Sequence, residues 1–244
     1  MPEAFLNLLA SGIMLSAALS DPREVTLNWL RLGGILSLAF GALGIFFMLR
    51  ATEAAPKPLL VLAGGVMAGI LGQLAFAQLA ARNIQRAFAA LAAAGGIYLG
   101  HRLLHASTPL SAIGIAAMTG IVLTEMLLGH AYLTASQMSM RPLRRLNLLL
   151  ASALVYRVMT AVVLVLILQS IRPIYMFWGY YGLYILTRWF VGLAIPAVFV
   201  YMTHDCIKRR ATQSATGILY VAGVLVFIGE IIATYLVRTT GLPF

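Results

Sequence analysis

The sequence predicts an all-α integral membrane protein with eight transmembrane helices, arranged as two parallel four-helix bundle repeats. Three observations support this fold class. The 244-residue chain is 61% hydrophobic and only 10% charged, whereas about 25% of the residues in a soluble domain are charged. Its mean hydropathy is +0.94. Apolar segments long enough to span a membrane recur along the whole chain.

A helix needs about 20 mostly apolar residues to cross the hydrocarbon core of a bilayer. Seven segments meet this requirement: 28–50, 57–81, 85–105, 109–133, 145–170, 173–203 and 212–237. Residues 4–20 form a shorter apolar run that resembles the hydrophobic region of a signal peptide, but no basic residues precede it. We therefore expect a retained first helix here, with a cleaved signal peptide as the alternative.

Short matches between the two halves of the chain predict an internal duplication. The matched pairs are 11–16 with 119–124, Gly72 with Gly192, and 97–101 with 226–230. The chain then divides into a scaffold unit, 1–107, and a second unit, 108–244, that carries the candidate site. Because each unit has an even number of helices, the two would be parallel repeats about an axis along the membrane normal.

The distribution of lysine and arginine among the loops predicts the orientation of the helices. One side carries Arg23, Arg82, Arg86, Arg141, Arg144, Arg145, Lys208, Arg209 and Arg210. The other side carries Arg50, Lys57, Arg102, Arg172 and Arg238. The first side is richer in bases and is therefore expected to be cytoplasmic. The protein would lie in a bacterial cytoplasmic membrane with both termini on the periplasmic or outer side.

Composition also excludes several classes of function. The net charge of +10 fits anionic lipid and the loop charge bias better than nucleic acid, because no basic run is interleaved with aromatic residues. The single cysteine, Cys206, excludes an internal disulfide and a cysteine-only metal or iron–sulfur site. We expect no metal site and no covalently bound cofactor.

Four ionisable residues interrupt the apolar segments of the second half: Glu125, Arg157, Arg188 and Glu230. A charge near the bilayer centre costs about 2.5–3.5 kcal/mol even on the lenient insertion scale. Such residues face a bundle interior or a polar cavity, so the two acids and two bases are expected to pair. The pairing is compatible with a structural ion-pair network and with a functional polar pocket, and both interpretations stay open.

Aromatic residues accompany these charges at helical spacing. Tyr181, Tyr184 and Arg188 fall on one face of the seventh segment, and Tyr156 lies next to Arg157 on the sixth. We expect these residues and Glu230 to line one cavity. An apolar pocket with a few fixed polar groups would suit a quinone-like head group. Close packing of small and hydroxyl residues is the alternative.

Two histidines lie toward the predicted cytoplasmic side, His130 on the fifth segment and His204 near the end of the seventh. Together they could hold a haem b, although His204 is expected in a loop. The preferred interpretation gives His130 a proton-handling role with Glu125 at the rim of the pocket, because histidine titrates near neutral pH.

The topology and two segments resemble the membrane-anchor group of polysulfide reductase and dimethyl sulfoxide reductase. The segments are residues 227–232, Phe-Ile-Gly-Glu-Ile-Ile, and the His130-containing end of the fifth helix before Arg141-Pro142. The resemblance implies a subunit without haem that binds quinone or quinol. It also implies electron transfer to iron–sulfur, cytochrome or molybdoenzyme-type subunits outside the membrane.

The leading hypothesis is therefore a quinone-binding anchor subunit of a bacterial respiratory redox complex, which is not catalytic alone. Tyr184 and Arg188 would orient the head group, and His130 and Glu125 would handle protons. The alternatives are a haem b anchor that uses His130 and His204, and a small-molecule or proton-coupled transporter. No unwound stretch inside a span is evident from the sequence, which argues against the transporter, and Pro196 predicts only a kink.

Overall fold

A computed structural model describes residues 1–51, 56–79, 81–106, 108–134, 139–169 and 175–241. The regular structure of these residues is helical. Eight helices are long and apolar enough to cross a membrane. The predicted class, a multi-pass all-helical membrane protein, is therefore confirmed, and the first span, Pro2–Leu19, covers the apolar run expected at 4–20 as far as Leu19.

The helices follow one another through short connections. Their bounds are Pro2–Leu19 (α1), Leu27–Arg50 (α2), Lys57–Gln78 (α3), Arg82–Leu104 (α4), Leu110–Thr134 (α5), Arg141–Gln169 (α6), Tyr175–Trp189 (α7), Ile195–Lys208 (α8) and Thr212–Thr240 (α9). A π-helical turn, Phe190–Ala194, joins α7 to α8. The candidate seventh span therefore runs from Gly179 to Lys208 through three consecutive helical elements.

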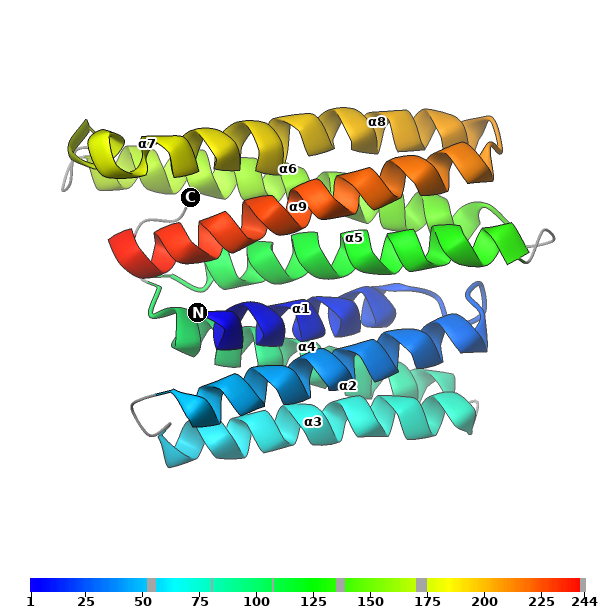
Figure 1. Ribbon diagram of the computed structural model, residues 1–244. Helices are drawn as coiled ribbons and strands as arrows, with labels where there is room; N and C mark the ends of the chain where they lie inside the picture. Colours follow the sequence, from blue (N-terminus) through cyan, green and yellow to red (C-terminus); the bar gives the residue numbers. More distant parts are fainter. Residues whose placement is uncertain (52–55, 80, 107, 135–138, 170–174, 242–244) are drawn as a thin grey trace.

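The helices lie roughly parallel to one another, with α1–α4 in the lower half of Figure 1 and α5–α9 in the upper half. In the lower half α1 and α3 both contact α2 and α4. In the upper half α5 and α8 both contact α6 and α9. The main contact between the halves is made by α1 and α5. The start of α1 and the end of α9 lie at the same end of the molecule (Figure 1).

Two glycines allow α1 and α5 to touch through their backbones. A Cβ atom added to Gly12 would stand 1.9 Å from the carbonyl oxygen of Ala116, and one added to Gly120 would stand 1.9 Å from the carbonyl carbon of Gly12. Membrane helices use such small residues for close approach, because no hydrophobic driving force operates between helices in lipid. The contact between the two halves therefore depends on these two positions.

The structure corrects three details of the sequence interpretation. The span expected at 173–203 contains the π-helical turn, where the N–H of Ile195 donates to the carbonyl of Phe190. Pro196, which has no N–H to continue the normal ladder, follows at once. His204 lies inside α8 rather than in a loop, because α8 continues to Lys208. Helix α6 begins at Arg141 and not at residue 145.

We predict that Gly120→Ala destabilises the folded protein. The added methyl group would overlap the backbone of Gly12, and overpacking of this kind costs about 1–3 kcal/mol or more. Thermal unfolding in mild detergent measures the effect. The matched control is Gly64→Ala on α3, where a Cβ atom meets nothing within 4 Å. Equal melting temperatures for the two variants would contradict the glycine contact.

Candidate functional site

The four ionisable residues expected inside the membrane are all fully buried. Glu125, Arg157, Arg188 and Glu230 each have 0% of their surface exposed. Three of them form one cluster, and the fourth lies elsewhere in the second half of the chain. The sequence pattern therefore identified the buried charges, and the structure decides which of them meet.

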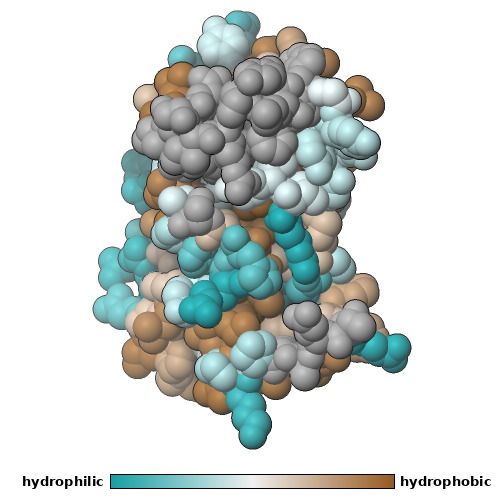
Figure 2. All heavy atoms as spheres, turned by 90° about the vertical axis from the view of Figure 1, so that its left-hand side faces the viewer, coloured by the Kyte–Doolittle hydropathy of each residue, from teal (hydrophilic) through white to brown (hydrophobic). Residues whose placement is uncertain are grey.

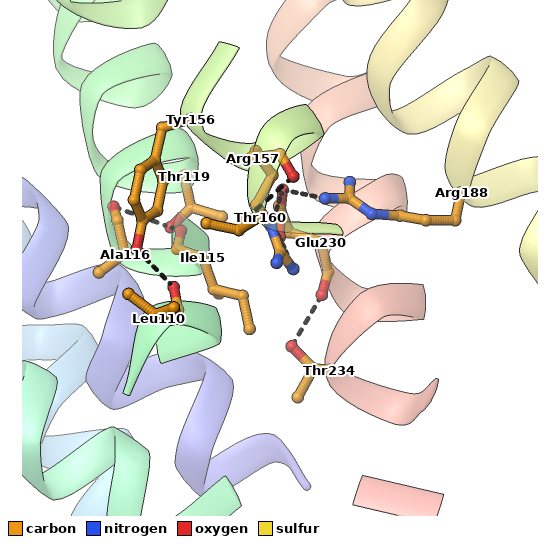
Figure 3. Close-up of polar contacts among 10 residues, drawn as sticks. All are labelled: Leu110, Ile115, Ala116, Thr119, Tyr156, Arg157, Thr160, Arg188, Glu230 and Thr234. Atoms are coloured by element: carbon orange, nitrogen blue, oxygen red, sulfur yellow. Dashed lines mark hydrogen bonds and ion pairs between the residues drawn. The ribbon is translucent and has the colours of Figure 1, made fainter. Parts of the chain in front are cut away.

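Glu230 is shared by two arginines that reach it from different helices (Figure 3). Arg188 Nη2, from α7, lies 2.9 Å from Oε1 of Glu230. Arg157 Nη2, from α6, lies 3.1 Å from Oε2, and Arg157 Nε lies 3.2 Å from the same atom. The ion triad Arg157–Glu230–Arg188 thus ties α6, α7 and α9 together through charge-assisted hydrogen bonds.

Three glycines make room for the arginine side chains of the triad. A Cβ atom on Gly114 would stand 2.7 Å from Cδ of Arg157. A Cβ atom on Gly192 would stand 2.9 Å from Nη1 of Arg188, and one on Gly229 would stand 3.2 Å from the same atom. Gly192 lies in the π-helical turn, one turn of helix after Arg188. The irregular turn and the glycines together place the guanidinium of Arg188 against α9.

The triad is not electrically balanced. It contains two guanidinium groups and one carboxylate, and all three side chains are buried. Within the described part of the chain, three of their nitrogen atoms have no hydrogen-bond partner: Nη1 of Arg157, and Nε and Nη1 of Arg188. Buried donors without partners are rare in native proteins and call for a water, an ion or a ligand. The triad therefore offers donors to a further group.

Glu125 is separate from the triad. On α5, Gly114 marks the level of the triad because it touches Arg157, and Glu125 lies about 16 Å further along the helix at about 1.5 Å per residue. The side-chain amide of Asn147 on α6 interacts with its carboxyl group, but among the described residues neither carboxyl oxygen makes a hydrogen bond of normal geometry. The single cavity expected from the sequence is thus divided into two polar clusters.

The tyrosines expected in the pocket lie around the triad without entering it. The hydroxyl of Tyr156 donates to the carbonyl of Leu110, 3.2 Å away. The rings of Tyr184 and Tyr181 lie 5.2 Å and 6.3 Å from the ring of Tyr235 on α9, measured between centroids. Tyr184 is 42% exposed. Tyr181, Tyr184 and Tyr235 form a tyrosine cluster that is accessible from the lipid side.

The two histidines occupy different surroundings. His130 is exposed, and its Nδ1 lies 3.4 Å from the hydroxyl of Tyr220 on α9. His204 is half-buried and lines a cavity at the end of the molecule where α5 and α8 finish. Among the described residues, no hydrogen bond or ring contact joins the two histidines, and the lining of that cavity does not include His130. The arrangement gives no support to a shared haem.

A second cavity, of about 1000 Å³, lies at the opposite end of the molecule. Hydrophilic side chains gather near the centre of this end (Figure 2). Arg238 of α9 pairs there with Glu3 of α1 at 2.5 Å, and His101 and His105 also line the cavity. Within the described part of the chain no group of three or more potential metal ligands is found.

Sequence reasoning missed three residues that the structure adds to the site. Asn147 is an amide flanked on both sides by leucines in α6, and this apolar setting could have identified it. Tyr235 contacts the other tyrosines only because α9 packs on α7, which no spacing within α9 reveals. Gly114 matters because α6 crosses α5 at that point, and this crossing is likewise set by tertiary packing.

We predict that Glu230→Gln strongly destabilises the protein. The substitution removes the carboxylate from two fully buried arginines, and breaking a buried ion pair costs about 3–5 kcal/mol. The control is Glu24→Gln, which removes the same charge from a pair with the exposed Arg145 and should cost at most about 1 kcal/mol. Denaturant or thermal unfolding in detergent compares the two. A loss for Glu230→Gln no larger than for Glu24→Gln would show that the triad does not stabilise the fold.

Comparison of the chain with protein-family models, curated proteins and solved structures finds no match. The resemblance to the anchor subunits of polysulfide and dimethyl sulfoxide reductases therefore remains a prediction from the sequence. The conclusion that the chain is a multi-pass helical membrane protein rests on its eight apolar helices.

Proposed function

We propose that this chain is the membrane-anchor subunit of a bacterial respiratory redox complex and that it binds a quinone in its second half. The chain would lie in the cytoplasmic membrane with both ends on the outer side. It would consist of two parallel four-helix units, 1–107 and 108–244, of which only the second retains a site. Iron–sulfur, cytochrome or molybdoenzyme-type partner subunits would supply the redox centres.

Burial along α1 and α5 supports the duplication. Every residue from Asn7 to Met14 is buried, and so is every residue from Ile115 to Val122. The residue that follows this run, Leu15 in α1 and Leu123 in α5, is half-buried in both helices, and the next two residues are buried again. This register pairs Gly12 with Gly120, the two glycines whose backbones touch. A contact between equivalent residues is what a two-fold axis between two units would produce.

The other helices extend this register. Each buried residue of α4 has a buried counterpart in α9 at one fixed separation along the chain. This separation pairs Gly100 with Glu230. The sequence match of 97–101 with 226–230 would instead pair Gly100 with Gly229, so the two registers differ by one residue. The expected pair of Gly72 and Gly192 does not fit this separation either. The buried positions of α2 and α6 likewise pair Gly44 with Arg157. Glycines in the first unit thus stand where the second unit carries charges of the triad.

The observation that carries the quinone proposal is the pair of free donors on Arg188 beside the tyrosine cluster. Nε and Nη1 of Arg188 have no partner, and Tyr184 lies one turn earlier on α7 with 42% of its surface exposed. A quinone arriving from the lipid could stack on the tyrosines and accept a hydrogen bond from Arg188 through a carbonyl oxygen. Apolar walls with a few convergent polar groups are typical of such sites.

Glu125 supplies the second part of the proposal. Reduction of a quinone takes up two protons with two electrons, so a protonatable group inside the membrane is needed. An ionised carboxylate without a cation partner is very costly when buried, so Glu125 is suited to take up and release a proton. His130, one turn further along α5 and exposed, would connect it to solvent. Protons would therefore pass along α5, apart from the triad.

A proton-coupled transporter is the second candidate, and the π-helical turn favours it. Irregular helical turns inside a span occur where transporters bind substrates, and π-bulges are frequent at functional sites. The turn at Phe190–Ala194 lies beside Arg188 in the middle of the seventh span. A transporter would move protons in liposomes without partner subunits, whereas a redox anchor would not.

We predict that quinone co-purifies with the protein and depends on Tyr184. The protein would be isolated in mild detergent, its lipids extracted and its quinone measured by chromatography. Tyr184→Leu should lower the quinone content by up to about tenfold, because an aromatic contact is worth about 0.5–1.5 kcal/mol. Tyr201→Leu is the control, because Tyr201 is 73% exposed on α8 and lies outside the cluster.

The same sample also tests the partners and the haem alternative. A redox anchor should bring down iron–sulfur, cytochrome or molybdoenzyme subunits. An absorption spectrum of the isolated chain would reveal haem b if His130 and His204 hold one. Absence of quinone from both the wild type and the Tyr201→Leu variant, together with absence of any redox partner, would refute the proposed function.

A further inference from the structure

All the charged side chains in the lining of the cavity that contains His204 are basic. Its volume is about 800 Å³, and it lies where α5 and α8 end and α6 and α9 begin. The charged and titratable side chains in its lining are Arg141, Arg144, His204, Lys208 and Arg210. No acidic residue lines it, and the sequence contains none between Glu125 and Asp205. We call this the basic pocket.

The bases of the pocket differ from their neighbours in having no acidic partner. Arg145, next to Arg144, pairs with Glu24 at 2.9 Å. Arg209, next to Lys208, pairs with Asp205 at 2.8 Å. Among the ion pairs of the described residues, none involves Arg141, Arg144, Lys208 or Arg210. The chain therefore neutralises the bases beside the pocket and leaves those that line it available.

Helix ends and hydroxyl groups add further donors. Thr212, the first residue of α9, lines the pocket, and the preceding Ala211 offers no side-chain cap to the free N–H groups of that helix. The free N–H groups and the dipole at a helix N-terminus favour anions. The hydroxyl of Tyr132 donates to the carbonyl of Ser139, which fixes the wall of the pocket just before α6. A phosphate group would thus meet guanidinium, hydroxyl and backbone donors together.

Orientation in the membrane does not by itself require this cluster. The register between the two units gives the positions in the first unit that correspond to the pocket. The register between α2 and α6 pairs Arg141 with Asn28 and Arg144 with Arg31. The separation found between α4 and α9, applied also to α3 and α8, pairs His204 with Leu74, Lys208 with Gln78 and Thr212 with Arg82. Two of these five equivalents are basic, whereas four of the five pocket residues are, so the first unit places fewer bases at these positions.

We infer that the basic pocket binds a phosphate-bearing anion. The group is either the head of an anionic phospholipid, with its chains along α6 and α8, or the phosphate of a soluble compound. Both sources share the chemistry that the pocket recognises, which is a compact multiple acceptor held by arginine forks and a lysine. This site is independent of the quinone proposal, because it lies at the end of the helices and uses none of the residues of the triad.

The test uses the full chain in nanodiscs of phosphatidylcholine. In one arm, a minor fraction of phosphatidylglycerol is added and the anionic lipids retained on the protein are counted by native mass spectrometry. In the other arm, inorganic phosphate and pyrophosphate are titrated by calorimetry. The variant Arg144→Gln/Lys208→Gln should bind about tenfold more weakly in whichever arm shows binding. The control, Arg23→Gln/Arg82→Gln, removes the same charge from the same predicted side and should bind as the wild type does.

Each outcome decides the inference. Retention of phosphatidylglycerol alone, lost in the pocket variant, identifies a lipid site. Binding of phosphate or pyrophosphate, lost in the same variant, identifies a soluble ligand. Equal weakening in both double variants would show that only general surface charge acts, and this overturns the inference. Absence of binding in both arms overturns it as well. Melting temperatures of the two double variants establish that both are folded.

Discussion

The second half of this protein depends on one constraint: a buried charged side chain must be paired with an opposite charge, or it becomes neutral. Glu230 meets this constraint for two arginines at once, with contacts of 2.9 Å to Arg188 and 3.1 Å to Arg157. Because each partner comes from a different helix, the pairing fixes the relative rotation of α6, α7 and α9. The glycines beside the arginines and the π-helical turn follow from the need to bring long side chains to a single carboxylate.

The triad also carries an excess positive charge, which a purely structural ion pair would not need. A neutral pair would have been enough to fasten two helices, but the second arginine leaves an excess charge and donors without partners. Buried ion pairs contribute little net stability compared with apolar packing, so an unbalanced cluster is better explained by a further occupant. Tyr184, with 42% of its surface exposed, lies one turn before Arg188 on α7, and Glu125 is a separate buried carboxyl group further along α5.

The sequence predicted what depends on local composition. Length and hydropathy identified all eight spans, since a membrane helix must be apolar over its whole length, and the four buried ionisable residues were evident for the same reason. It did not predict that Glu125 stands apart from the other three, because rotation and crossing of helices decide which buried charges meet. The side chains of Gly100 and Glu230 share no chemistry, so the sequence could not reveal that both positions are buried at matching places in α4 and α9. The π-helical turn was not predicted because Pro196, which follows it directly, was expected to produce only a kink.

A double-mutant cycle on Arg188 and Glu230 tests the central claim most directly. Unfolding free energies in detergent would be measured for Arg188→Met, Glu230→Gln and the combined variant. If the two side chains are paired inside the membrane, the combined loss should be smaller than the sum of the single losses by about 1–3 kcal/mol. Strict additivity would mean that the two groups do not interact, and the account of the triad would then be wrong.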